Sequence, residues 1–217
     1  MNIQLPDSLT LIVIMGALGL VPFLAIMVTS FLKISIVMML VRNALGVQQA
    51  PPNSAIYGLA IILTAYIMAP VGSTIYDSLQ SKNLNFSDPP AVLQELGESM
   101  EPFREFLKRR VRPDELNFFL RTTRSMWPRE MADKVDKESY IILIPAFTVS
   151  ELSSAFEIGF LLYLPFIAID LIVSNILLAM GMMMVSPLTI SLPFKLLLFV
   201  LVNGWSRLIQ GLVLTYN

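Results

Sequence analysis

The sequence contains neither cysteine nor histidine in 217 residues. Without cysteine the chain has no disulfide and no thiolate metal site. Without histidine it lacks the commonest general base and the commonest metal ligand. The net charge is −1, so no strongly basic surface points to nucleic acid. We therefore expect neither a metal site nor a nucleic-acid partner.

Charge is also scarce. Charged residues make up 14% of the chain and hydrophobic residues 55%, whereas a soluble domain carries about 25% charged residues. Residues 8–32, 43–76 and 171–194 carry no charge at all, and a membrane helix needs about 20 apolar residues. The first basic residue is Lys33, so the first apolar run lacks the basic start of a signal peptide and is expected to stay in the membrane.

The remaining charge is concentrated in one segment, because residues 77–138 hold 23 of the 31 charged residues. This distribution predicts an all-α integral membrane protein with two apolar helical hairpins, residues 1–76 and 139–217, separated by a polar helical insert, residues 77–138. In the first hairpin we expect a helix over 8–41 kinked near Pro22. A proline-containing turn and a second helix over 55–76 should follow.

The insert has the pattern of soluble helices. Ser87, Asp88 and Pro89 predict a helix start, and apolar residues then recur at steps of three and four as far as Leu107. A second short helix is expected after Pro113. In the last third, residues 140–149 are apolar but too short to span a bilayer. A break is expected at 186–187 and a last apolar segment over 193–214.

The short loops near Arg42 and Lys195 each carry positive charge, which predicts that they lie on the cytoplasmic side. The insert and both termini would then lie on the outer side of the membrane.

Ionisable residues lie within or beside the apolar segments, where they are costly unless they face protein or a water-filled cavity. We expect them to form charge pairs between helices or between subunits, with Asp170 or Glu157 paired to Lys33, Lys195 or Arg207. A proton relay at Asp170 is an alternative. The candidate residues are Lys33, Glu151, Glu157, Asp170, Lys195 and Arg207.

Three consecutive methionines, Met182, Met183 and Met184, precede the break at 186–187. On a helix three consecutive side chains spread over about 200°, but in a loop all three can approach one axis. A ring of such loops from several subunits would form a soft apolar seal for a pore. The alternative is that these methionines merely fill space in a lipid-facing or core stretch.

Several blocks in both apolar halves resemble the FliP and SctR family of type III secretion systems, and the match favours the virulence injectisome branch over the flagellar one. The insert carries none of this resemblance. The blocks are TSFLK (29–33), VRNALG (41–46), APPN (50–53), IPAF (144–147), SEL (150–152), AFEIGF (155–160), LPF (164–166), IDL (169–171), MGMMMVSP (180–187), TISLPFKL (189–196) and NGW (203–205).

The resemblance implies a subunit of the export apparatus in the bacterial inner membrane, working as an entry pore for unfolded secretion substrates. Family members form a pentameric ring that joins S-, T-, U- and V-type export proteins (SctS, SctT, SctU and SctV) and leads to needle or inner-rod subunits. Their hairpins rise out of the bilayer plane toward the periplasm, in contact with lipid. The methionine loop would be the constriction. Energy comes from other subunits, so the chain would be no enzyme and would need no cofactor.

Two other classes stay open at this point. A proton- or solute-coupled membrane transporter would show paired half-repeats with matching breaks, and none is visible in the sequence. A membrane-anchored scaffold without a pore would differ from the pore by lacking an axial channel ringed by Met182 to Met184.

Overall fold

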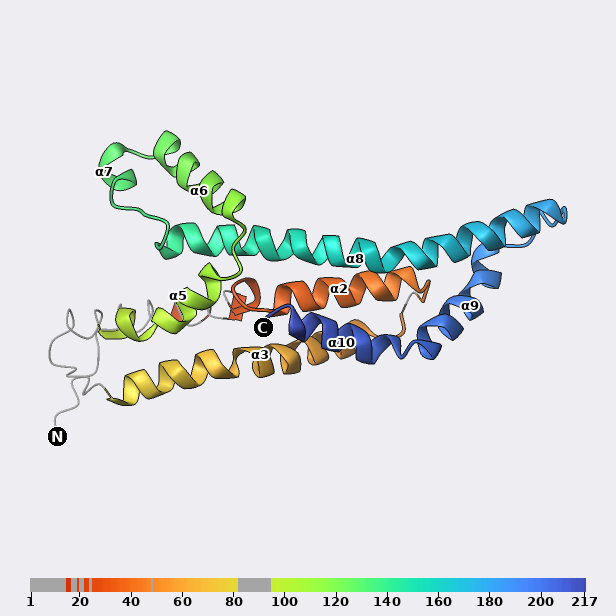
Figure 1. The fold of residues 1–217 in the computed structure, drawn as a ribbon, viewed down its shortest axis with the longest axis horizontal. Helices are drawn as coiled ribbons and strands as arrows, with labels where there is room; N and C mark the ends of the chain where they lie inside the picture. The colour runs from red at the N-terminus through yellow and green to blue at the C-terminus, as the bar shows by residue number, and fades with distance from the viewer. Residues whose placement is uncertain (1–14, 17–18, 20–21, 24, 48, 82–94) are drawn as a thin grey trace.

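The computed structural model describes residues 15–16, 19, 22–23, 25–47, 49–81 and 95–217, and no strand occurs in these ranges. The prediction of an all-α membrane protein is confirmed. The helices, shown in Figure 1, are α2 (Phe31–Ala44), α3 (Asn53–Ser81), α5 (Glu101–Lys108), α6 (Pro113–Met126), α7 (Arg129–Ala132), α8 (Tyr140–Ala179), α9 (Pro187–Leu201) and α10 (Gly204–Leu214).

Helix α8 is the longest element, with 40 residues, or about 60 Å at about 1.5 Å per residue. It includes residues 140–149, which we expected to form a separate short segment, and Pro145 and Pro165 lie inside it without ending it. A proline in a helix interior costs about 3 kcal/mol. The packing of α8 against α2, α6 and α9 offsets that cost. The helix is about twice as long as the hydrocarbon core is thick.

Helices α3 and α8 are long and apolar enough to cross a membrane, and α9 with α10 makes a third candidate span bent by 60°. The last apolar segment begins at Pro187 rather than at 193, since Pro193 lies inside α9. Near the N-terminus, Pro22 and Phe23 are helical and residues 28–30 are not. The helix is therefore interrupted at residues 28–30, just before α2, and not at Pro22, where the kink was expected. The helix start expected at 87–89 lies outside the described residues.

Helix α2 lies at the centre of the molecule, beside α8 on one side and α3 on the other (Figure 1). Its residues Ile34, Val37, Met38 and Val41 are at most 2% exposed and form the middle of the main core. Close approach of α2 and α8 requires a glycine, because a Cβ at Gly159 would lie 2.2 Å from Cδ1 of Leu40. The two helices run in the same direction, so the start of each lies near the insert.

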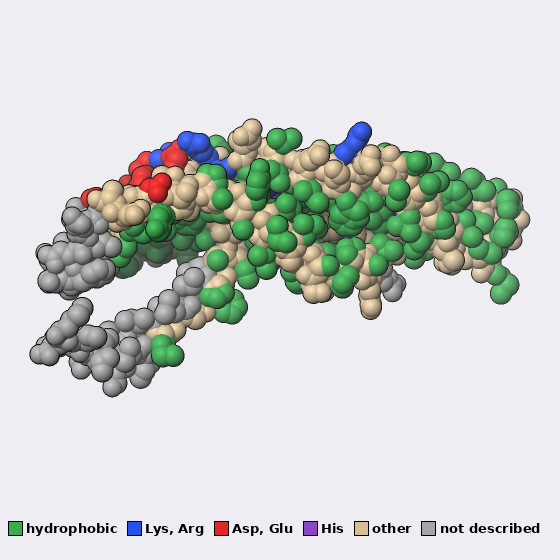
Figure 2. All heavy atoms as spheres, turned by 90° about the horizontal axis from the view of Figure 1, so that it is seen from below, with side chains coloured by type: hydrophobic (Ala, Val, Ile, Leu, Met, Phe, Trp, Pro, Cys, Tyr) green, Lys and Arg blue, Asp and Glu red, His purple; other side chains and the backbone are tan. Residues whose placement is uncertain are grey.

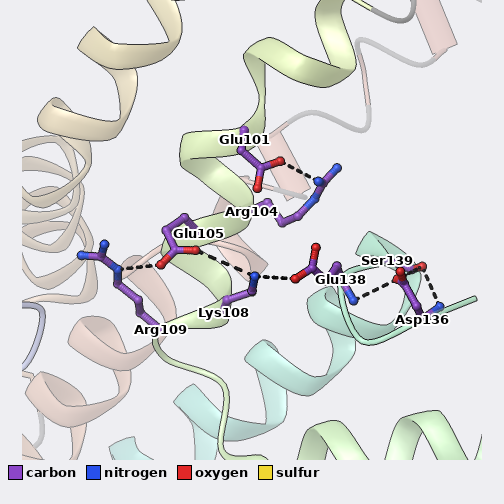
Figure 3. A network of polar contacts seen from close by, with 8 residues as sticks. All are labelled: Glu101, Arg104, Glu105, Lys108, Arg109, Asp136, Glu138 and Ser139. Atoms are coloured by element: carbon purple, nitrogen blue, oxygen red, sulfur yellow. Dashed lines mark hydrogen bonds and ion pairs between the residues drawn. The ribbon is translucent and has the colours of Figure 1, made fainter.

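The insert is joined to the membrane part by apolar contacts and by ion pairs. Phe106 and Leu107 of α5 pack against Leu143 and Phe147 of α8. A chain of ion pairs on the outside of α5 continues into the turn before α8 through Lys108, whose Nζ lies 2.7 Å from Oε1 of Glu138 (Figure 3). This bond and the burial of α5 fix the insert against the first turns of α8.

Large hydrophobic side chains remain exposed over most of the body. Helix α3 buries only Ile56 and Ala60 of its 29 residues. Figure 2 shows hydrophobic side chains over most of the visible face, including the narrow end that carries the α8–α9 hairpin, while charged side chains gather near the other end. Such a surface is far larger than a soluble monomer exposes, so lipid or partner proteins must cover it.

Candidate functional site

The methionine loop joins α8 to α9 at the far tip of the hairpin (Figure 1). Helix α8 ends in a Schellman motif, in which Gly181 N–H donates to the carbonyl of Leu178 at 3.0 Å and Met182 N–H donates to the carbonyl of Leu177 at 2.9 Å. Gly181 has φ +72°, a conformation that glycine adopts without steric cost. The glycine thus reverses the chain and starts the loop.

The three methionines that follow are exposed by 38% at Met182, 82% at Met183 and 100% at Met184. Nothing in the described part of the chain packs over the last two. Met183 and Met184 therefore lie outside the core of this chain, and a lipid-facing stretch stays an alternative to the pore. The apolar, flexible side chains of Met183 and Met184 project from the end of the hairpin.

A buried ion pair joins α2 to α8 in the centre of the molecule. Nζ of Lys33 lies 3.1 Å from Oε1 of Glu151, and the two side chains are 5% and 2% exposed. The hydroxyl of Tyr216 donates to Oε2 of Glu151, and the Lys33 ammonium lies 3.9 Å from the centre of the Tyr216 ring. Arg110 in turn donates to the backbone carbonyl of Tyr216. The C-terminus is therefore held against α2, α8 and the end of α5.

A second pair joins α8 to α9. Nζ of Lys195 lies 2.5 Å from Oδ2 of Asp170, and the hydroxyl of Ser191 donates to Oδ1 of Asp170 at 2.6 Å. Lys195 also donates to the carbonyl of Ala44, at the end of α2, at 3.2 Å. Lys195 is 2% exposed inside α9, so it is not a loop residue. It therefore carries no weight in the charge argument for a cytoplasmic loop.

The other two candidates stand apart. Glu157 pairs with Arg112, at 2.6 Å between Oε1 and Nη1, on the surface. Its partner comes from the insert and was not among the basic residues expected for it. Arg207 is exposed on α10 and forms no ion pair within the part of the chain that the structure describes.

Lys33, Glu151, Asp170 and Lys195 thus form two ion pairs between helices of one chain. Sequence reasoning missed Tyr216, Ser191, Arg110 and Arg112 as partners. A buried carboxylate needs more than one donor, but Tyr216 lies 65 residues from Glu151. No spacing rule connects them, because only the return of α10 alongside α2 brings the C-terminus back.

Among the described residues no group of three or more carboxylates is placed to hold a metal ion. The arrangement instead combines an apolar, exposed tip with helices joined by two ion pairs, one buried and the other part-exposed at Asp170.

Comparison with known proteins shows the family, because residues 14–212 match the FliP family. The chain belongs to the FliP family. It is 56% identical over 215 residues, 99% of each chain, to "Yop proteins translocation protein R" of Yersinia pestis. It is 46% identical to "Harpin secretion protein HrcR" of Erwinia amylovora over 216 residues, 100% of each chain.

A further FliP-family relative is "Virulence protein YscR" of Salmonella typhimurium, 47% identical over 216 residues, which are 99% of this chain and 100% of the relative. These full-length matches confirm the resemblance to the SctR proteins of type III secretion and its virulence branch. The first two relatives are named for translocation and secretion and the third for virulence, and none of these three names describes an enzyme.

Proposed function

We propose that this FliP-family chain forms, with further copies of itself, the export gate of a type III protein secretion system, and that Met182, Met183 and Met184 close the passage. The observation that carries this proposal is the exposure of Met183 and Met184, 82% and 100%, at the end of a hairpin. The names of the relatives, which concern translocation and secretion, support protein as the cargo.

Physical chemistry supports methionine for this role. The thioether side chain is unbranched and polarisable, and it repacks around partners of different shape. A ring of apolar side chains blocks ions by excluding water from a constriction. A polypeptide in transit would push the same side chains aside. The seal would thus be tight when empty and tolerant of varied sequences when occupied.

The proposed setting is the bacterial inner membrane, with the insert on the periplasmic side and the complex raised toward the periplasm. Helix α8 supports it, since about 60 Å of helix exceeds a hydrocarbon core of about 30 Å. The exposed apolar faces of α3 and α8 support assembly with other copies, a ring of five by family likeness, and with S-, T-, U- and V-type export proteins. Needle or inner-rod subunits would follow on the outer side.

The test replaces Met182, Met183 and Met184 by alanine together and measures two quantities in one strain. The first is the abundance of the assembled complex, and the second is leakage of small ions or dyes across the inner membrane without substrate. Abundance should stay normal, because the side chains are exposed and contribute little packing. Leakage should rise, because alanine widens the constriction.

A matched control replaces two other exposed methionines, Met126 on α6 and Met131 on α7, which are 74% and 56% exposed. This variant removes similar side chains from the insert and should not leak. Normal abundance of the triple variant without leakage would refute the gate assignment. So would equal leakage from the control.

A further inference from the structure

The tip of the hairpin is carried by a thin arm, which we define as residues 171–190. It comprises the last turns of α8, the methionine loop and the first turn of α9. Figure 1 shows it projecting past the ends of α2 and α10. Within the arm only Leu177 is buried. The rest of the chain therefore does little to hold the arm in place.

Apolar packing between the two legs of the arm is also incomplete. A groove of about 400 Å³ separates them, open on one side. Its lining residues are Ile169, Ile172, Val173, Ile176, Leu177, Ile190 and Phe194. A gap of this size lacks the dense contacts that give a core a single arrangement. Apolar packing alone therefore restrains the angle between the legs only weakly.

At the base of the arm lies the polar network already described. Asp170 uses both carboxylate oxygens, one toward Ser191 at 2.6 Å and one toward Lys195 at 2.5 Å. Ser191 is fully buried, and Lys195 is 2% exposed. Lys195 reaches on to the carbonyl of Ala44 at 3.2 Å, where a positive charge suits the negative end of α2. The network thus connects α8, α9 and the end of α2.

We propose that Asp170, Ser191 and Lys195 are positioning residues that set the direction of the arm and thereby place the methionine loop. Charge-assisted hydrogen bonds are short and directional, so they restrain an angle in a way that loose apolar contacts do not. From Asp170 to Met180 the helix rises about 15 Å, so a change of about 10° at the base moves the tip by roughly 3 Å.

The absence of cysteine in the chain makes a direct test possible. Single cysteines at Met180, which is 62% exposed at the tip, and Ile61, which is 59% exposed on α3, accept spin labels without removing any native thiol. Pulsed electron paramagnetic resonance then measures the distance between them in the assembled complex. Labelled chains are diluted with unlabelled ones so that each complex carries one labelled copy.

We expect one narrow distance distribution in the parent chain. Asp170→Asn should broaden or shift it by about 3 Å or more, since the carboxylate loses its charge toward Lys195. Ser191→Ala should broaden it less, since it removes one hydrogen bond and keeps the ion pair. If the Asp170→Asn protein does not accumulate in the cell, the nearly isosteric Ser191→Ala variant alone tests whether the network positions the arm.

Two controls separate positioning from general loosening. Glu157→Gln removes a charge from the same helix outside the arm, and Arg112→Gln removes the exposed partner of that charge on the insert. Both should leave the distribution narrow. An unchanged distribution in Asp170→Asn and Ser191→Ala, or the same broadening in the controls, would overturn the proposal.

The link to gating rests on the proposed function, but the distance measurement does not. If the arm moves in Asp170→Asn while the alanine variant of Met182 to Met184 shows no leak, the positioning role of Asp170 is supported and the gate assignment is refuted. If the arm does not move, the positioning role is refuted whatever the leak assay shows.

Discussion

The buried pair between Lys33 and Glu151 gives the strongest test of how this fold is held. Replacing Lys33 by methionine keeps the length of the side chain and removes its charge. The Glu151 carboxylate, 2% exposed, then keeps the hydroxyl of Tyr216 and loses the ammonium at 3.1 Å. Breaking one side of a buried pair costs about 3–5 kcal/mol, because the remaining charge stays in a poorly hydrated site.

The magnitude agrees with a simple Coulomb calculation. At 3.1 Å two unit charges attract by about 5 kcal/mol with an effective dielectric constant of about 20. For a chain of this size each kcal/mol lowers the melting temperature by about 2–4 °C. Lys33→Met and Glu151→Leu should therefore each lower the melting temperature of the detergent-purified protein by roughly 6–20 °C.

Removing both charges should behave differently from removing one. A buried pair exchanged for apolar residues of similar volume is often neutral or stabilising. The double variant Lys33→Met with Glu151→Leu should therefore recover much of the loss, but it leaves the hydroxyl of Tyr216 without its acceptor. Adding Tyr216→Phe should recover the rest.

The assay is thermal unfolding followed by tryptophan fluorescence, together with the yield of assembled complex. Arg112→Gln is the control, because its pair with Glu157 is exposed and such pairs contribute little. If Lys33→Met melts within about 2 °C of the parent, the energetic reasoning is wrong. If the variant with Lys33→Met, Glu151→Leu and Tyr216→Phe is as unstable as the single variants, the pair stabilises the fold through something other than charge compensation.

Three glycine or turn positions give further predictions, each measured by the same melting assay. Gly159→Ala should destabilise the chain by about 1–3 kcal/mol through a clash with Leu40, and Leu40→Ala in the same chain should relieve part of it. Gly58→Ala, on α3 with nothing within 4 Å of the added carbon, is the control and should be neutral or stabilising. Gly181→Ala should cost about 1–2 kcal/mol at φ +72° and alter the methionine loop. Asn203, at φ 53° between α9 and α10, should tolerate glycine and be destabilised by leucine, and equal melting of the two variants would contradict the turn assignment.

Several features follow from the sequence alone, because they depend on composition and local chemistry. The uncharged runs predict apolar helices, since a buried backbone without water must satisfy its own hydrogen bonds. The break at 186–187 follows from Ser186 and Pro187, and α9 begins at Pro187. The charges inside apolar runs predict pairs such as that of Asp170 with Lys195, since an isolated charge is too costly there.

Tertiary structure decided the rest. The sequence showed residues 140–149 only as an apolar run too short to span a bilayer, but α8 runs through them and past the buried Glu151, whose charge Lys33 of α2 compensates. A buried charge or a proline is tolerated inside a helix when neighbouring elements offset its cost, and neighbours distant in sequence cannot be read from local pattern. The role of Tyr216 depends in the same way on the course of α10 beside α2. The residues of the buried network were thus visible in the sequence, while their partners were fixed only by how the helices pack.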